Sequence, residues 1–352
     1  MQLSSSADIL KKLRSDGPER VYYLYGRDVG ALESFAKALT GKICPKADRI
    51  MNYHRFDGSK LDVPAFHDAC EMLPMFAQRV LVAVNDLNMD SVNKSDSELI
   101  YKTIGDLPET TTVVIYSTAA ELYKNKRSLT DKNKRLADLC AKQGISFEFA
   151  FKRAYDLAKS IITAFEKEGC SISKFDAEYL AEQCLCETSA VKQEIAKLSA
   201  YAAGRQVTRA DIDALCIKKV ESDGFALAIN ILRQNPAFVF GRIRELAEQN
   251  YEAFAILSTI SMSLNDLYRA RLALSSGKTQ AAVTADFKYP KNREFVVKNS
   301  MNEIQNISDM RIRKVIGILS DTDLRLKTVS GGRQADLLTL EEAAAKAMTI
   351  RG

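Results

Sequence analysis

The sequence predicts an α/β domain over residues 1–150, built as three layers around a parallel sheet, followed by two all-α domains over residues 151–220 and 221–352. Two observations lead to this prediction. In the first part of the chain, short apolar runs of strand length alternate with amphipathic helical segments, as in α/β proteins. After residue 150 the strand-like runs stop and only helical spacing remains. The length of 352 residues suits two or three domains.

Five short segments of the first domain are predicted to be strands. Two of them, at residues 80–84 and 112–116, are apolar throughout, which is typical of strands covered on both faces of a parallel sheet. Between the strands, apolar residues at spacings of three and four predict helices over residues 31–39 and 63–72. The predicted strands are residues 21–25, 54–57, 80–84, 112–116 and 147–149.

The rest of the chain is predicted to be helical, with a domain boundary near residues 220–223. Ser173 and Thr208 stand where each can cap the N-terminus of a helix. Only residues 279–291, which contain Tyr289 and Pro290, interrupt the helical pattern. The predicted helices are residues 155–168, 175–184, 190–201, 211–215, 225–233, 237–249, 252–275, 293–299, 301–305 and 308–327.

Composition places the chain among soluble globular proteins, with 46% hydrophobic and 27% charged residues and a net charge of +5. This mild positive charge neither requires nor excludes a nucleic-acid partner. There is no apolar run of membrane-spanning length, so no membrane role is expected, and the N-terminus does not resemble a secretory signal. Seven cysteines without a framework spacing suggest reduced thiols, so we expect a cytoplasmic protein.

The turn after the first strand lies where an α/β nucleotide-binding protein has its phosphate loop. Such a loop needs glycines five residues apart, followed by Lys and Ser or Thr. Here Gly26 and Gly30 are four apart, and Ala31 and Leu32 stand in place of the polar pair. Asp28 adds a carboxylate that repels phosphate oxygens. We therefore interpret the turn as structural and expect no cofactor.

The other candidate phosphate-binding, metal-binding and catalytic motifs are weaker. The run Gly277-Lys278-Thr279 ends like a phosphate loop, but it follows a helical segment, so it is interpreted as the end of a helix. A single carboxylate, Asp86, follows the third strand, and a lone Asp there is more often a turn residue than a metal ligand. The two histidines and the Cys184-x-Cys186 pair lack metal-site partners, so we expect no catalytic residue and no metal.

Two segments suggest contacts with other molecules. In the first, Pro74 ends the helix before it, so the apolar Leu73, Met75 and Phe76 fall in a loop. Such residues are either packed under the domain or offered to a partner, and from the residues alone burial is the favoured interpretation.

The second segment is basic. It is either a solvated helix face or a contact for phosphates or an acidic protein, and the residues leave these alternatives open. Its cations, set against the single acidic residue Asp131, are Lys124, Lys126, Arg127, Lys132, Lys134 and Arg135.

In order and spacing, these features resemble the delta subunit family of the bacterial DNA polymerase III clamp loader, over nearly the whole chain. No single motif is specific, and the blocks at 194–198 and 323–327 are the most similar to the family. The matching runs are VYYLYG at 21–26, FDG at 56–58, LPMFAQRVLV at 73–82, DLP at 106–108, KRL at 134–136, EIAKL at 194–198 and DTDLRLK at 321–327.

The resemblance implies an AAA+-like domain without a working phosphate loop, a helical lid domain and a helical collar domain for oligomerisation. It implies a subunit of the DNA polymerase holoenzyme that does not hydrolyse ATP, and that binds and opens the sliding clamp (the beta subunit). The family's apolar wedge aligns with Met75 and Phe76, with Leu73 before it and Arg79 after it. Further implied partners are the gamma/tau and delta prime subunits in a five-subunit ring, and primer-template DNA within that complex.

Two functions from other classes remain as alternatives. The first is a divergent AAA+-type ATPase that uses the turn between Gly26 and Gly30. The second is a DNA-binding accessory protein that works through the basic segment, and it predicts a steep salt dependence of DNA affinity for the isolated chain.

Overall fold

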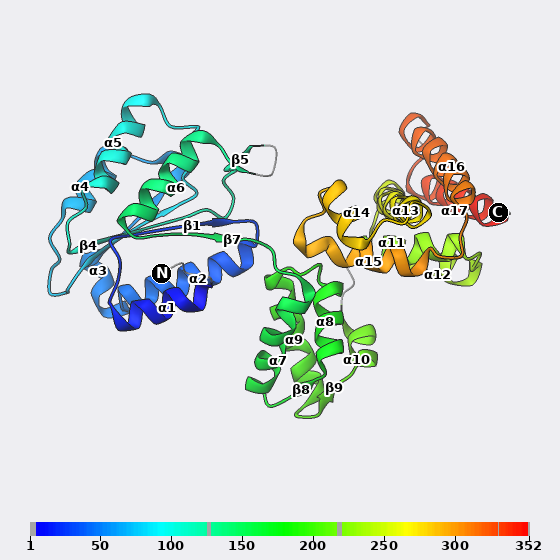
Figure 1. Cartoon of the computed structure of the whole chain (residues 1–352), viewed down its shortest axis with the longest axis horizontal. Coiled ribbons are helices and arrows are strands. Elements are labelled where there is room, and N and C mark those ends of the chain that lie inside the picture. The colour runs from blue at the N-terminus through cyan, green and yellow to red at the C-terminus, as the bar shows by residue number, and fades with distance from the viewer. Residues whose placement is uncertain (1–4, 125–127, 217–219, 330, 351–352) are drawn as a thin grey trace. The chain divides into compact units, whose positions relative to one another are not determined.

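A computed structural model describes residues 5–124, 128–216, 220–329 and 331–350 (Figure 1). The chain divides into two compact units, Met1–Ala150 and Phe151–Gly352. The first contains a five-stranded sheet with helices around it, and the second is built almost wholly of helices. The predicted fold class, an α/β domain followed by an all-α part, is therefore confirmed.

The sheet of the first unit has the strand order β2-β3-β4-β1-β7, and each neighbouring pair is parallel. All five predicted strands are present, with ends shifted by at most two residues. Continuous apolar runs identified them correctly because the central strands are buried on both faces. The strands are β1 Val21–Gly26, β2 Tyr53–Asp57, β3 Val80–Asn85, β4 Thr111–Tyr116 and β7 Ile145–Phe149.

Helices cover both faces of this sheet and complete the three layers (Figure 1). Tyr22 and Leu24 join a core with α1 and α2 on one face, whereas Val21 and Tyr23 join a core with α4, α5 and α6 on the other. The alternation along β1 is the two-residue period of a strand. The remaining elements of the unit are α1 Ser6–Ser15, α2 Val29–Ile43, η1 Lys46–Asp48, α3 Arg49–Asn52, η2 Gly58–Lys60, α4 Val63–Glu71, α5 Lys94–Gly105, α6 Asp131–Gln143 and the hairpin β5 Tyr123–Lys124 with β6 Ser128–Leu129.

The second unit begins with four helices that share one hydrophobic core. The prediction that strands stop at residue 150 was wrong in one detail, because two-residue strands form a parallel pair here. Ser173 caps α8 as predicted, by accepting the N–H of Asp176. The elements are α7 Ala154–Lys167, β8 Ser171–Ile172, α8 Lys174–Gln183, α9 Thr188–Ala202, β9 Gln206–Val207 and α10 Arg209–Leu215.

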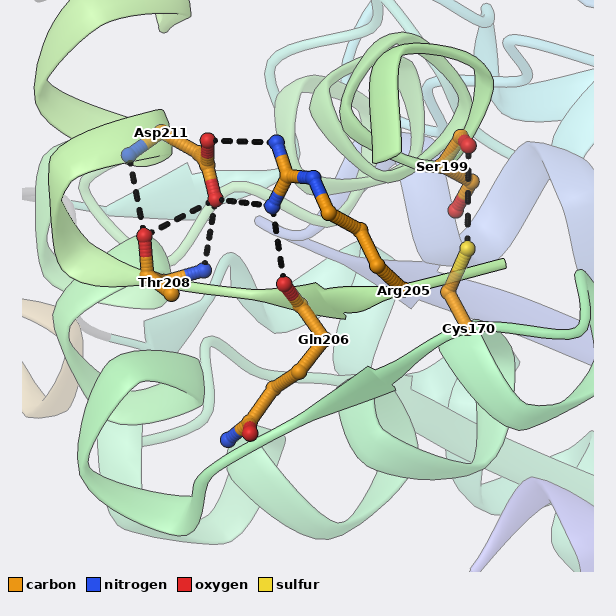
Figure 2. Close-up of polar contacts among 6 residues, drawn as sticks. All are labelled: Cys170, Ser199, Arg205, Gln206, Thr208 and Asp211. Atoms are coloured by element: carbon orange, nitrogen blue, oxygen red, sulfur yellow. Dashed lines mark hydrogen bonds and ion pairs between the residues drawn. The ribbon is translucent and has the colours of Figure 1, made fainter. Parts of the chain in front are cut away.

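Thr208 caps α10, also as predicted, through a reciprocal pair of hydrogen bonds (Figure 2). Its hydroxyl accepts the N–H of Asp211 at 3.4 Å, and the Asp211 carboxylate accepts the N–H of Thr208 at 2.8 Å. The Arg205 guanidinium donates to both oxygens of the same carboxylate at 2.7 Å. These donors, Arg205 foremost, hold the pKa of Asp211 well below its usual value.

The rest of the second unit is a larger group of helices with its own core around α13. Two predictions were wrong here: residues 279–291, predicted to interrupt the helices, contain α14, and the single helix α15 at residues 294–303 stands where two helices, 293–299 and 301–305, were predicted. The elements are α11 Val220–Leu232, α12 Pro236–Glu248, α13 Ala253–Ser275, α14 Gln280–Asp286, η3 Lys291–Arg293, α15 Glu294–Glu303, α16 Asp309–Thr328 and α17 Arg333–Thr349.

Candidate functional site

The apolar loop, defined here as residues 72–79, connects α4 to β3 and exposes its large side chains. Leu73 is 77% exposed, Met75 50% and Phe76 97%. The interpretation that these residues are packed under the domain was therefore wrong. Phe76 has a backbone φ of 55°, in the left-handed region that few residues other than glycine adopt. An aromatic side chain that is both fully exposed and held in this conformation suits contact with a partner better than a structural role.

A buried side chain outside the loop holds its backbone. Asn52, at the end of α3, is 1% exposed. Its amide oxygen accepts the N–H of Met75 at 2.7 Å, and its Nδ2 donates to the carbonyl oxygen of Met75 at 2.8 Å and to that of Asp48 at 3.1 Å. Sequence analysis did not single out Asn52, because nothing in the sequence links residues 23 positions apart.

Arg79, the last residue of the apolar loop, is half-buried and points toward β4, where its guanidinium donates to Thr112 Oγ1 at 3.4 Å. Together with Phe76 it lines a groove of about 590 Å³ that Arg14 and Lys42 also line. Asp48 is the one acidic residue in this lining, so the groove beside Phe76 is net positive.

The basic segment does not form one continuous cationic face. Arg135 lies over the Tyr101 ring, 4.0 Å from its centroid, and donates to both oxygens of Glu98 at 3.0 and 3.3 Å, which lowers the pKa of Glu98. Lys132 donates to the Val92 carbonyl at 3.3 Å.

The other cations of the basic segment divide into two groups. Lys124 and Lys134 are exposed. Lys126 and Arg127 lie outside the described residues. Lys132 and Arg135 are exposed as well, but their side chains contact the Val92 carbonyl and Glu98.

The turn after β1 is filled by protein atoms. Gly26 has φ 142°, and a Cβ there would lie 2.3 Å from the carbonyl oxygen of Phe149. Asp28 is 3% exposed, and its carboxylate accepts the N–H of Ala31 at 3.1 Å. The carboxylate therefore takes the position at the N-terminus of α2 where a bound phosphate would receive backbone N–H groups.

The other candidates of the sequence analysis have structural partners. Asp86 Oδ1 accepts backbone N–H groups of Thr118 at 2.6 Å and Ala119 at 2.7 Å, so it joins the ends of β3 and β4. Lys278 Nζ lies 2.5 Å from a carboxylate oxygen of Asp286. Among the described residues, no group of three or more His, Cys, Asp and Glu side chains is placed to hold a metal ion.

All seven cysteines are buried. Burial raises the pKa of the Cys70 thiol to about 12 and also raises that of Cys140.

In the part of the chain that the structure describes, no helix is both long and apolar enough to cross a membrane.

The apolar loop and the turn after β1 lie at opposite ends of the parallel strands. The loop leads into the amino end of β3, whereas the turn leaves the carboxyl end of β1, and all strands are parallel. A strand of six residues is about 20 Å long. The surface offered by the loop is therefore separate from the edge where α/β proteins bind nucleotides.

Comparison with solved structures finds the same fold in the Bacillus subtilis DNA clamp loader delta protein (YqeN), with 20% identity and a TM-score of 0.64, over 98% of this chain and 100% of that one. A DNA polymerase III gamma subunit-related protein of Thermotoga maritima aligns at 13% identity and a TM-score of 0.37, over 98% and 99% of the two chains. The T. maritima RuvB Holliday junction branch migration motor aligns at 16% identity and a TM-score of 0.37, over 65% and 74%.

None of the curated proteins compared with this chain matches it. Two sequence models of one family do match. Residues 22–142 match the model of the DNA polymerase III delta subunit, and residues 221–341 match the model of the C-terminal domain of that subunit. The two matches together span more than half of the sequence, and they confirm the predicted resemblance. The chain therefore belongs to the DNA polymerase III delta subunit family.

Proposed function

We propose that this chain is the clamp-loader subunit that binds the sliding clamp through the apolar loop and opens it. The observation that carries the proposal is the 97% exposure of Phe76 in a left-handed backbone conformation. Leu73 and Met75 add apolar surface in the same loop, and Arg79 lines the same groove as Phe76. An apolar pocket on the clamp is the partner chemistry that this loop fits.

The proposed mechanism is differential binding. A ring opens when a ligand binds the open form more tightly than the closed form. Shifting such an equilibrium from 1:99 to 99:1 takes about 5.5 kcal/mol of difference in binding free energy. Burial of Met75 and Phe76 supplies about 1.5–3 kcal/mol each. Together they can therefore supply at most about 3–6 kcal/mol of that difference, and they supply it only to the extent that the clamp buries them in its open form and not in its closed form.

ATP turnover is not part of this proposal. The buried Asp28 carboxylate at the start of α2 and the close approach of Gly26 to Phe149 support a turn with a structural role. The competing hypothesis of a divergent ATPase requires saturable ATP binding at this turn, and a titration with micromolar ATP distinguishes the two. Binding that substitution of residues 26–32 abolishes would favour the ATPase.

The helical unit is proposed to supply the lid, residues 151–220, and the collar, residues 221–352. Two main hydrophobic cores support this division, one in α7–α10, against which Phe295 of α15 also packs, and one in α11–α13, α16 and α17. Through the collar, the chain would join gamma/tau and delta prime subunits in a five-subunit ring. Within that ring the exposed Lys124 and Lys134 are the candidates for contact with primer-template DNA.

The central experiment measures clamp binding by isothermal titration calorimetry. Met75→Ala combined with Phe76→Ala is expected to weaken binding at least a hundredfold, since about 3–6 kcal/mol of burial is lost. Phe175→Ala is the matched control, because Phe175 lies on α8 and is 83% exposed. Unchanged affinity in the double variant, with the same unfolding temperature, would refute the proposal.

A further inference from the structure

The Asn52 side chain makes the hydrogen bonds to the apolar loop that a neighbouring strand would otherwise make. Its amide pairs with both the N–H and the carbonyl of Met75, at 2.7 and 2.8 Å, as a neighbouring strand would. A third hydrogen bond, to the Asp48 carbonyl at 3.1 Å, fixes the amide to its own helix. Because Asn52 is 1% exposed, water competes little for these bonds.

The orientation of Phe76 follows from this anchorage. Phe76 is 97% exposed, so packing against the chain does not hold its side chain in place. The direction of the side chain is therefore set by the backbone. Asn52 holds that backbone at the preceding residue, Met75, through hydrogen bonds to its N–H and its carbonyl oxygen. Freed from that anchor, Phe76 would leave the left-handed region, which is unfavourable for an aromatic residue.

The same amide joins the apolar loop to a second exposed apolar pair. Ile50 and Met51, the residues just before Asn52 on α3, are 92% and 50% exposed. Adjacent Cα atoms lie about 3.8 Å apart, and one side chain bridges Asn52 to Met75. Asn52 thus brings together the backbones of two segments that are distant in sequence, each of which carries exposed apolar residues.

We propose that Asn52 is the positioning residue of the clamp-binding surface, and that it holds the apolar loop against α3 so that Ile50 and Met51 contact the clamp together with Phe76. This inference rests on the proposed function. The partner in this proposal is the sliding clamp, because Ile50 and Met51 directly precede the residue that is hydrogen-bonded to the proposed clamp-binding loop. A loop already held in its bound conformation loses less entropy on binding and binds more tightly.

The test of the anchor compares Asn52→Ala with Asn133→Ala in the full-length chain. Asn133 is the matched control: it is also a fully buried amide, and its Oδ1 accepts the N–H of Met89 at 3.0 Å, away from the apolar loop. Both variants are expected to unfold at lower temperature than the wild type. Only Asn52→Ala is expected to weaken clamp binding in calorimetry, by about tenfold, which is about 1.4 kcal/mol.

Two further measurements separate positioning from stability. Hydrogen exchange at the amide of Met75 is expected to accelerate in Asn52→Ala and not in Asn133→Ala. Asn52→Asp keeps the size of the side chain but loses both Nδ2 hydrogen bonds, so it is expected to weaken clamp binding as Asn52→Ala does. An equal loss of affinity in the Asn52 and Asn133 variants would mean that Asn52 acts only through stability, and would overturn the inference.

The α3 contact is tested by Ile50→Ser with Met51→Ser, which is expected to weaken clamp binding about fivefold or more. Phe175→Ser, on an exposed aromatic residue of α8, is its control. Phe76→Ala is measured in the same series. If Phe76→Ala leaves the affinity unchanged, the proposed function itself fails. If Phe76→Ala weakens binding but either Asn52→Ala or the α3 variant binds like the wild type, the function stands and this inference is wrong.

Discussion

Replacing Phe76 with glycine is expected to remove clamp binding without a loss of folding stability. A left-handed backbone destabilises the folded state by about 1–2 kcal/mol at a residue other than glycine. Glycine avoids this cost, but it loses more conformational entropy on folding, which destabilises the folded state by about 0.5–1 kcal/mol. Phe76 is 97% exposed, so removal of its side chain breaks few contacts within the chain. The difference between these two terms predicts that Phe76→Gly is between equally stable and about 1.5 kcal/mol more stable than the wild type. Phe76→Ala keeps the unfavourable backbone and is expected to match the wild type.

The assay is scanning calorimetry of the full-length chain, in which the two units can unfold separately. Phe66→Ala, a fully buried core variant of the α/β unit, identifies the transition of that unit by lowering its stability by about 3–5 kcal/mol. A gain of about 1 kcal/mol raises the unfolding temperature of a unit of this size by about 2–4 °C. If Phe76→Gly instead lowers stability by more than about 1 kcal/mol, the ring packs within the folded chain and the reasoning is refuted.

Three other outcomes are expected. Asp28→Ala should cost about 1 kcal/mol of stability in denaturant unfolding through loss of the helix cap, and should still show no saturable ATP binding. Asp211→Asn should lower the unfolding temperature above about pH 4, and the difference should disappear as the pH falls, because Arg205 lowers the pKa of Asp211 in the folded state only. Lys124→Glu with Lys134→Glu should reduce DNA retention by the assembled loader and leave clamp binding unchanged. The slope of the logarithm of DNA affinity against the logarithm of salt concentration should become shallower by about two. Unaltered retention at low salt would exclude these lysines as DNA contacts.

The fold was predictable where local pattern and tertiary environment agree. The strands at 80–84 and 112–116 are apolar throughout because both faces of β3 and β4 are covered, and helix caps such as Thr208 depend on neighbours only three residues away. The α14 helix was missed because Tyr289 and Pro290 suggested an interruption, although that pair lies just beyond the helix end at Asp286. The prediction failed there because a helix-breaking proline marks a helix boundary but does not show on which side of it the helix lies.

The candidate site was predictable only in its residue types. Apolar residues after Pro74 mark a loop, but they do not show that Phe76 is exposed or that its neighbour Met75 is hydrogen-bonded to Asn52, 23 positions earlier in the sequence. Likewise, the charge count of the basic segment does not reveal that Arg135 is paired with Glu98 on another helix. Long-range partners of this kind have no signature in a single sequence.

The burial of all seven thiols makes this chain convenient for optical study. Maleimide dyes react with accessible thiolate, and thiols that are shielded and hard to ionise, such as that of Cys70, react slowly. One cysteine introduced at an exposed position would therefore carry a fluorophore selectively, with every native cysteine left in place. Energy transfer from that dye to a labelled clamp would then follow binding in real time and would test whether the ring opens as proposed.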